Sequence, residues 1–220
     1  MAYGFRQRIR CAWRELTKRE EPSPPPPLPY SRLILICGMP RTGTSALASY
    51  VGSHPDVRLV VGGDYWKRCE SNLVRDGNIE WKLLNGVMKK LEPWRVLIKQ
   101  PWLETNMDFF PRVPGARVIV CFRQTEGLFD SWFRTWTAGR EGKYQPQKVY
   151  EQKLIYGEEL VSSGALRIDM EKLGSHIAKK IGRHLDLDHR GFDAERIKKK
   201  WREDKERQWV MENAVWQPTK

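Results

Sequence analysis

The sequence predicts a three-layer α/β fold, in which a central, mostly parallel sheet of about five strands is flanked by helices. Short apolar runs rich in branched residues recur along the chain, as expected of buried parallel strands. Stretches with apolar residues at helical spacing lie between these runs. With 220 residues and 40% hydrophobic content, the chain is long enough to bury the core of one domain.

Four apolar runs are the candidate strands, and two stretches have a clear helical pattern. The runs cover residues 33–37, 57–61, 96–101 and 117–123. One helix is expected to follow Gly43 and to stop at His54-Pro55, because proline cannot continue a helix. The second helix is expected over 79–91, with Pro93 behind it. A further helix is expected to open within 125–132. Residues 132–164 are predicted to form two short helices whose aromatic side chains belong either to the core or to an acceptor groove.

The first 30 residues differ from the rest of the chain. Residues 1–20 form a basic amphipathic N-terminal segment, with apolar residues at helical spacing and arginines between them. Such a segment suits contact with a membrane surface or a partner, and equally a docking face on its own domain. Residues 21–30 are rich in proline, which is typical of an extended linker. The folded domain is therefore predicted to cover 31–220.

The cysteines and the net charge indicate the compartment of the protein and the kind of partner it binds. The four cysteines form no CxxC pair, which argues against a disulfide framework or a zinc site and favours a reducing, cytoplasmic location. We expect no metal. No run approaches the roughly 18 apolar residues of a membrane span, and the N-terminus lacks the apolar core of a signal peptide. The net charge of +12 favours polyanionic partners such as nucleotide phosphates, acidic glycans, nucleic acid or anionic lipid.

A glycine-rich loop follows the first strand, and it nearly reproduces the Walker A pattern G-x-x-x-x-G-K-[ST]. Gly38 and Gly43 have the required spacing, but Thr44 stands where the phosphate-binding lysine is expected, and Arg41 supplies a cation inside the loop. A strand, a glycine loop and a helix N-terminus together form a phosphate site. Without the lysine, we expect a 5′-phosphate that carries one further anionic group. The predicted binding residues are Pro40, Arg41, Thr42, Gly43, Thr44 and Ser45. A plain turn without a ligand is the alternative.

Residues 38–47, followed by Ser53-His54-Pro55-Asp56-Val57, resemble the 5′-phosphosulfate loop of sulfotransferases that use PAPS (3′-phosphoadenosine 5′-phosphosulfate). The similarity is greatest to the arginine-loop type found in bacterial, tyrosylprotein and Golgi carbohydrate sulfotransferases. Arg123 and Ser131 resemble the 3′-phosphate element of that family, although Arg123-Gln124-Thr125 departs from its usual turn. The alternative for Arg123 is a structural salt bridge. Residues 165–173 resemble the family's fifth strand and a helix start at Glu171.

The resemblance spans about residues 32–190 and implies a P-loop NTPase-like fold, PAPS as the sulfuryl donor and PAP as the product. The reaction it implies is metal-independent, in-line transfer to an acceptor hydroxyl, for which a carbohydrate is our expectation. Arg41 and Lys99 are expected to stabilise charge on the bridging oxygen. Cytosolic members carry a histidine base after the third strand, where this chain has Lys99-Gln100-Pro101. Asp64 is therefore the candidate general base and Glu70 the reserve.

Three further expectations concern other residues. His54 is expected to cap the loop helix rather than to act in catalysis. A basic C-terminal segment, either 189–191 or 198–200, is expected to close on the 3′-phosphate or to form a solvated face. Acceptor contacts are expected from 66–92 and 132–164.

The sequence is also compatible with two other classes of function. One is a P-loop nucleoside or sugar kinase, although the missing lysine and the lack of a clear Walker B aspartate count against it. The other is a non-catalytic basic module for nucleic acid or acidic glycan, which only the charge and the scattered tryptophans support. For the sulfotransferase interpretation no nucleic-acid partner is expected.

Overall fold

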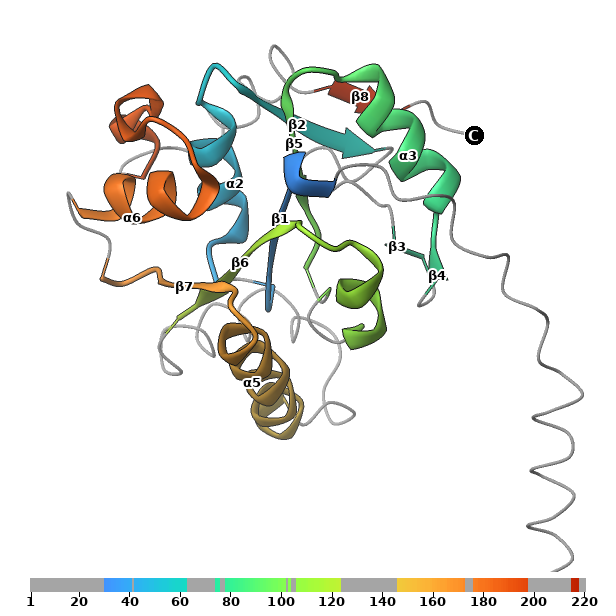
Figure 1. The fold of residues 1–220 in the computed structure, drawn as a ribbon. Coiled ribbons are helices and arrows are strands. Elements are labelled where there is room, and N and C mark those ends of the chain that lie inside the picture. The colour runs from blue at the N-terminus through green and yellow to red at the C-terminus, as the bar shows by residue number, and fades with distance from the viewer. Residues whose placement is uncertain are drawn as a thin grey trace, which may run out of the picture.

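The structure is a computed structural model that describes residues 30–40, 42–62, 74–75, 78–101, 103, 106–123, 146–172, 176–197 and 215–217. Within these residues it has the predicted α/β architecture, with a parallel sheet between two layers of helices (Figure 1). None of the described helices is long and apolar enough to span a bilayer.

The main sheet has six strands in the order β7-β6-β1-β5-β2-β8, and every neighbouring pair is parallel. Its strands are β1 Leu33–Gly38, β2 Val57–Gly62, β5 Arg95–Lys99, β6 Arg117–Phe122, β7 Leu166–Asp169 and β8 Val215–Gln217. The five predicted strands correspond to five of these. The prediction of a parallel sheet of about five strands is confirmed, and the additional strand β8 comes from a three-residue segment that pairs with the distant β2.

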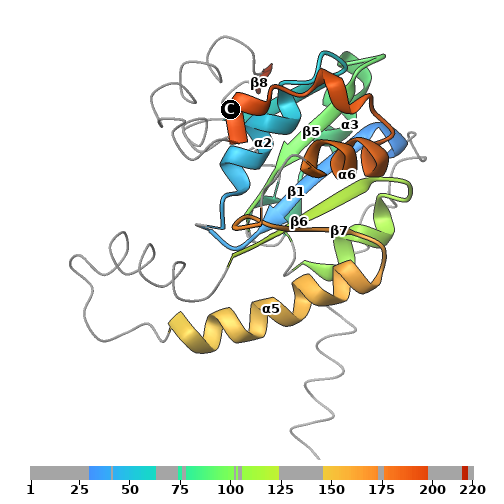
Figure 2. The same ribbon diagram turned by 90° about the vertical axis from the view of Figure 1, so that its left-hand side faces the viewer.

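Helices cover both faces of the sheet. On one face lie α2 Thr44–Gly52 and α6 His176–Leu185, and on the other lie α3 Trp81–Lys90, the 3-10 helix η4 Met107–Arg112 and α5 Pro146–Ser162 (Figures 1 and 2). The remaining elements are short: η1 Tyr30–Arg32, η5 His189–Gly191, η6 Ala194–Ile197, and a separate hairpin of β3 Val74–Arg75 with β4 Asn78–Ile79.

Of the predicted segment 132–164 the structure describes residues 146–164, in which 146–162 form a single helix of 17 residues and Tyr156 is exposed. The helix start predicted at Glu171 was wrong. Glu171 lies in a turn, and the described helix that follows it begins at His176. The expected helix over 125–132 and the N-terminal segment 1–20 lie outside the described residues.

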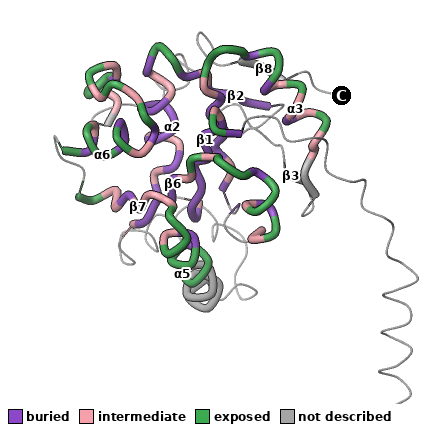
Figure 3. The backbone as a smooth tube through the Cα atoms, viewed as in Figure 1, coloured by how far each residue is buried: buried purple, intermediate pink, exposed green. Residues whose placement is uncertain are grey.

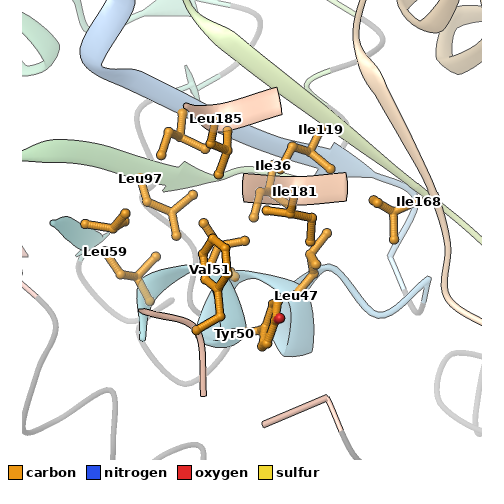
Figure 4. Close-up of a cluster of buried hydrophobic side chains, with 14 of the residues drawn as sticks. Ile36, Leu47, Tyr50, Val51, Leu59, Leu97, Ile119, Ile168, Ile181 and Leu185 are labelled. Carbon is orange, nitrogen blue, oxygen red and sulfur yellow. The ribbon is translucent and has the colours of Figure 1, made fainter. Parts of the chain in front are cut away.

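Successive residues of the central strands contribute to opposite faces of the sheet, which therefore carries two cores. In Figure 3 the buried residues concentrate in these strands and in α2. Along β1, Ile34 and Ile36 pack toward α2 and α6, while Leu33, Leu35 and Cys37 pack toward α3. Figure 4 shows the first of these cores, in which Leu47 and Val51 of α2 meet Ile181 and Leu185 of α6. Cys37 of β1 and Cys121 of β6 are both buried.

His54 closes and fixes the C-terminal end of α2: its backbone amide donates to the Val51 carbonyl at 3.3 Å, and its ring makes further contacts. Its Nδ1 accepts a hydrogen bond from the Asp56 amide at 3.1 Å, which leaves Nε2 as the donor to the Asp188 carbonyl, also at 3.1 Å. The ring is buried and packs on Phe192, with ring centroids 5.0 Å apart. Nε2 therefore joins the end of α2 to the segment after α6, while Nδ1 holds the ring to the turn that follows α2.

The basic segment 189–191 lies at the wrong end of α2 to reach a nucleotide at the loop. A Cβ on Gly191 would stand 2.5 Å from the His54 ring, which follows the C-terminus of α2. The loop is at the opposite end of this nine-residue helix, about 13 Å away. Arg190 is also engaged locally, since its side-chain hydrogen bonds lower the pKa of Asp188 to about 2. This location favours the other role expected for 189–191, a solvated face, on which Arg190 is exposed.

Replacing His54 with alanine should lower the free energy of unfolding by about 2–4 kcal/mol, since the change leaves a cavity and removes two buried hydrogen bonds. Urea unfolding would measure this. His176→Ala is the matched control, because His176 is exposed at the start of α6 and alanine favours helix. Equal stability of the two variants would contradict a locking role for His54.

Candidate functional site

The carboxyl ends of the central strands meet at a topological switch point. From β1 the chain passes through α2 to β2 on one side, whereas β6 lies on the other side of β1. In open α/β sheets ligands bind in the crevice at such a point. Figure 2 shows the end of β1 leading into α2 beside the end of β6.

The two glycines of the loop are required by their backbone conformation and their neighbours. Gly38 has φ +135°, and a Cβ there would stand 2.7 Å from the carbonyl oxygen of Cys121 on β6. Gly43 has φ +93° and precedes α2, and a Cβ there would stand 2.7 Å from the Cε of Met170. Between them the Thr42 amide and hydroxyl both donate to the Met39 carbonyl, at 3.2 and 2.7 Å. These contacts fold the loop tightly over the sheet edge.

The N-terminus of α2 presents backbone donors at this edge. Gly43 precedes the helix without a side-chain hydrogen bond from the described residues to cap it. The first four amides of a helix have no acceptor within it, so they and the helix dipole favour an anion here. Thr44 is buried and Ser45 half-buried in this first turn, which carries no acidic residue.

Lys99 ends β5 beneath the loop. It pairs in register with Ile36 of β1, two residues before Gly38, and only 2% of its surface is exposed. Because alternate residues of a strand lie on the same face of a sheet, Lys99 is on the same face as Leu97, which packs in the core under α2. An ammonium group is rarely buried so deeply unless an anion or strong acceptors stabilise it. Lys99 is the last residue of β5, so it lies at the carboxyl edge of the sheet, as predicted.

Arg123 lies at the same edge as the loop, on the neighbouring strand. Cys121 pairs in register with Gly38, and Arg123 follows two residues later, directly after the end of β6. Its Nε lies 3.7 Å from Oε1 of Glu171, and both side chains are about one-third exposed, at 36% and 34%. The structure thus contains the salt bridge that the sequence left open as an alternative for Arg123.

Comparison with known proteins gives a likeness of fold only. No protein-family model and no curated protein matches the sequence. Among solved structures, the chain is similar to the mouse sulfotransferase SULT7A1, whose crystal structure is a complex with PAP. The identity is 15% and the TM-score 0.44, and the match covers 82% of this chain and 64% of that one. The chain thus spans less than two thirds of the length of that protein.

Sequence reasoning overlooked Gln100, which follows Lys99. Its side-chain oxygen is buried and has no hydrogen-bond partner in the part of the chain that the structure describes. A buried amide oxygen without a partner costs free energy, so such a group often marks a place where a ligand donates. In the sequence, the only indication that Gln100 could belong to a site is its position directly after the end of a strand.

Four of the predicted site residues lie outside the described residues: Arg41, Asp64, Ser131 and the reserve base Glu70. The same holds for the basic segment 198–200. The structure brings together Pro40, Thr42, Gly43, Thr44, Ser45, Lys99 and Arg123 at one edge of the sheet. Across the described ranges, no group of three or more histidine, cysteine or acidic residues is arranged to hold a metal ion.

Proposed function

We propose that this protein transfers a sulfuryl group from PAPS to an acceptor hydroxyl. One observation supports this most strongly: the pairing of Gly38 with Cys121 sets the loop and Arg123 at one edge of two adjacent strands. Each is suited to an anion, the loop through the amides at the start of α2 and Arg123 through its guanidinium. An adenosine with phosphate groups at its 5′ and 3′ positions carries two anions that match this pair of sites.

The proposed chemistry is an in-line displacement at sulfur. The acceptor oxygen forms a bond to sulfur while the bond from sulfur to the bridging oxygen breaks, and PAP leaves with the electron pair. Amides at the start of α2 and the hydroxyls of Thr44 and Ser45 hold the 5′-phosphate, and Arg41 and Lys99 stabilise the charge that develops on the bridging oxygen. The hydroxyl proton passes to a carboxylate, for which Asp64 is the first candidate and Glu70 the second.

The ends of the strands beside β1 favour this reaction over magnesium-dependent phosphoryl transfer. P-loop kinases and ATPases hold Mg²⁺ with the P-loop hydroxyl and with an aspartate at a strand end. Here the two strands that flank β1 lead into Lys99 and Arg123. Cations at both positions suit an anionic substrate that brings no metal with it.

A carbohydrate acceptor is the second part of the proposal. The buried Gln100 oxygen beside Lys99 is suited to accept a hydrogen bond from a hydroxyl, and sugars offer several. Screening sugars, phenols and tyrosine peptides with labelled PAPS would test this part separately from the donor.

Thermal unfolding with added ligands tests the donor assignment. Adenosine 3′,5′-bisphosphate at about a hundred times its dissociation constant should stabilise the protein by about 2.7 kcal/mol, because it binds only the folded state. ATP with Mg²⁺, heparin and DNA are the comparison ligands. Stabilisation by ATP with Mg²⁺ alone would support the kinase interpretation instead, and stabilisation by heparin or DNA alone would support the binding module.

A further inference from the structure

The turn between β7 and α6 lies against both candidate anion positions. Its Met170 packs on Gly43 at the start of α2, where a Cβ would come within 2.7 Å of the methionine methyl. Its next residue, Glu171, forms the ion pair with Arg123 at 3.7 Å. One short segment therefore places an apolar side chain against the loop and a carboxylate against the arginine.

Backbone hydrogen bonds hold this turn in place. The Met170 amide donates to the Phe122 carbonyl at 2.9 Å, directly before Arg123, and the Lys172 amide donates to the Asp169 carbonyl at 2.9 Å. Arg167 then ties Asp169 through Nε at 3.0 Å. These hydrogen bonds fix the backbone on both sides of Glu171 and so keep its carboxylate close to Arg123.

The ion pair itself is open to water. Both side chains keep about one-third of their surface exposed, and 3.7 Å is longer than a direct hydrogen bond. Water screens such pairs, so they add little to stability. A phosphate group offers more charge and more acceptor oxygens than a carboxylate, so it can replace Glu171 as the partner of Arg123.

We propose that Glu171 is an internal competitor of the nucleotide's 3′-phosphate for Arg123, a specificity-determining role that rests on the proposed function. In the empty protein its carboxylate partly neutralises Arg123. In the complex it stays near the phosphate and repels it, so PAPS and PAP both bind less tightly than Arg123 alone would allow. The repulsion acts on a group that the product keeps, so it speeds release of PAP.

Titration calorimetry on the full chain can test this role without knowledge of the acceptor. Removing the charge by Glu171→Gln should tighten binding of adenosine 3′,5′-bisphosphate about two- to fivefold, the range expected for an exposed ion pair. Binding of adenosine 5′-monophosphate, which lacks the 3′-phosphate, should not change. Glu92→Gln is the matched control, because Glu92 pairs with Arg32 at 3.0 Å beside the start of β1, at the other edge of the sheet.

Arg123→Ala completes the test. This variant should bind the bisphosphate at least about tenfold more weakly, because it loses charge-assisted hydrogen bonds, and adding Glu171→Gln to it should tighten binding less than it does in the wild type, because only the direct repulsion of the phosphate is then relieved. Unchanged or weaker bisphosphate binding in Glu171→Gln, and likewise in Glu171→Ala, would overturn the competitor role, as would equal tightening for the monophosphate. If the wild-type protein shows no preference for the bisphosphate over the monophosphate, the proposed function fails and this inference fails with it.

Discussion

Replacing Arg41 with alanine should lower the rate of sulfuryl transfer more than about a hundredfold, while the protein remains folded. In the sequence Arg41 stands between Pro40 and Thr42, in the loop that closes over the end of β1. A cation at that position would neutralise charge that appears on the bridging oxygen only in the transition state, and removing such a group costs about 10²–10³ in rate. Transfer of labelled sulfate from PAPS to the acceptor found by screening would measure the loss.

Two further variants make the Arg41 result interpretable. Arg41→Lys should recover part of the rate, because it restores the charge without the planar guanidinium. Arg95→Ala should transfer at the wild-type rate, since Arg95 lies at the start of β5 and bonds to the Asp186 carbonyl at 3.0 Å. Full activity in Arg41→Ala would show that the loop does not serve the transferred group.

The Gly38→Ala substitution should destabilise the fold by about 3 kcal/mol or more and abolish nucleotide binding. The backbone there has φ +135°, which costs an L-residue about 1–2 kcal/mol. The new methyl group would also stand 2.7 Å from the Cys121 carbonyl oxygen, and crowding of a packed site adds about 1–3 kcal/mol. A carbonyl of the central sheet cannot turn away as the end of a side chain can. Urea unfolding and calorimetry with the bisphosphate would measure both effects.

Two other glycines separate the causes of this loss. Gly164 has φ +101° and open space around it, so Gly164→Ala should cost only the backbone strain, about 1–2 kcal/mol. Gly86 lies inside α3 with nothing near its missing Cβ, so Gly86→Ala should stabilise the protein by about 0.5–1 kcal/mol. If Gly38→Ala were no worse than Gly164→Ala, close contact between β1 and β6 would not be what requires glycine there.

The sequence was sufficient for the central part of the fold because its signals are local. The runs at 33–37 and 117–123 are apolar enough to be buried on both faces, and the spacing of Gly38 and Gly43 marks the end of one strand and the start of one helix. The positions of Lys99 and Arg123 at strand ends follow from the same patterns. These features need no knowledge of which strands become neighbours.

The features that the sequence did not reveal depend on contacts between distant segments. The strand β8 exists because residues 215–217 pair with β2, and a run of three residues is too short to carry a strand pattern of its own. The contact of the His54 ring with the Asp188 carbonyl could not be predicted, because the two residues are 134 positions apart in the sequence. The pairing of Arg123 with Glu171 likewise depends on how the turn after β7 is fixed to the end of β6.

The reactivity of the buried thiols of Cys37 and Cys121 can be used to follow local opening of the structure around the central sheet. They belong to the paired strands β1 and β6, and the Cys37 thiol lies 3.8 Å from the Ile119 carbonyl. Cys121 belongs to the core under α2 and Cys37 to the core under α3, so an alkylating reagent can reach them only when the packing over the sheet opens locally. With Cys11 and Cys69 replaced by serine, the alkylation rate followed by mass spectrometry would report this opening, and a nucleotide bound at the edge of the sheet would slow it.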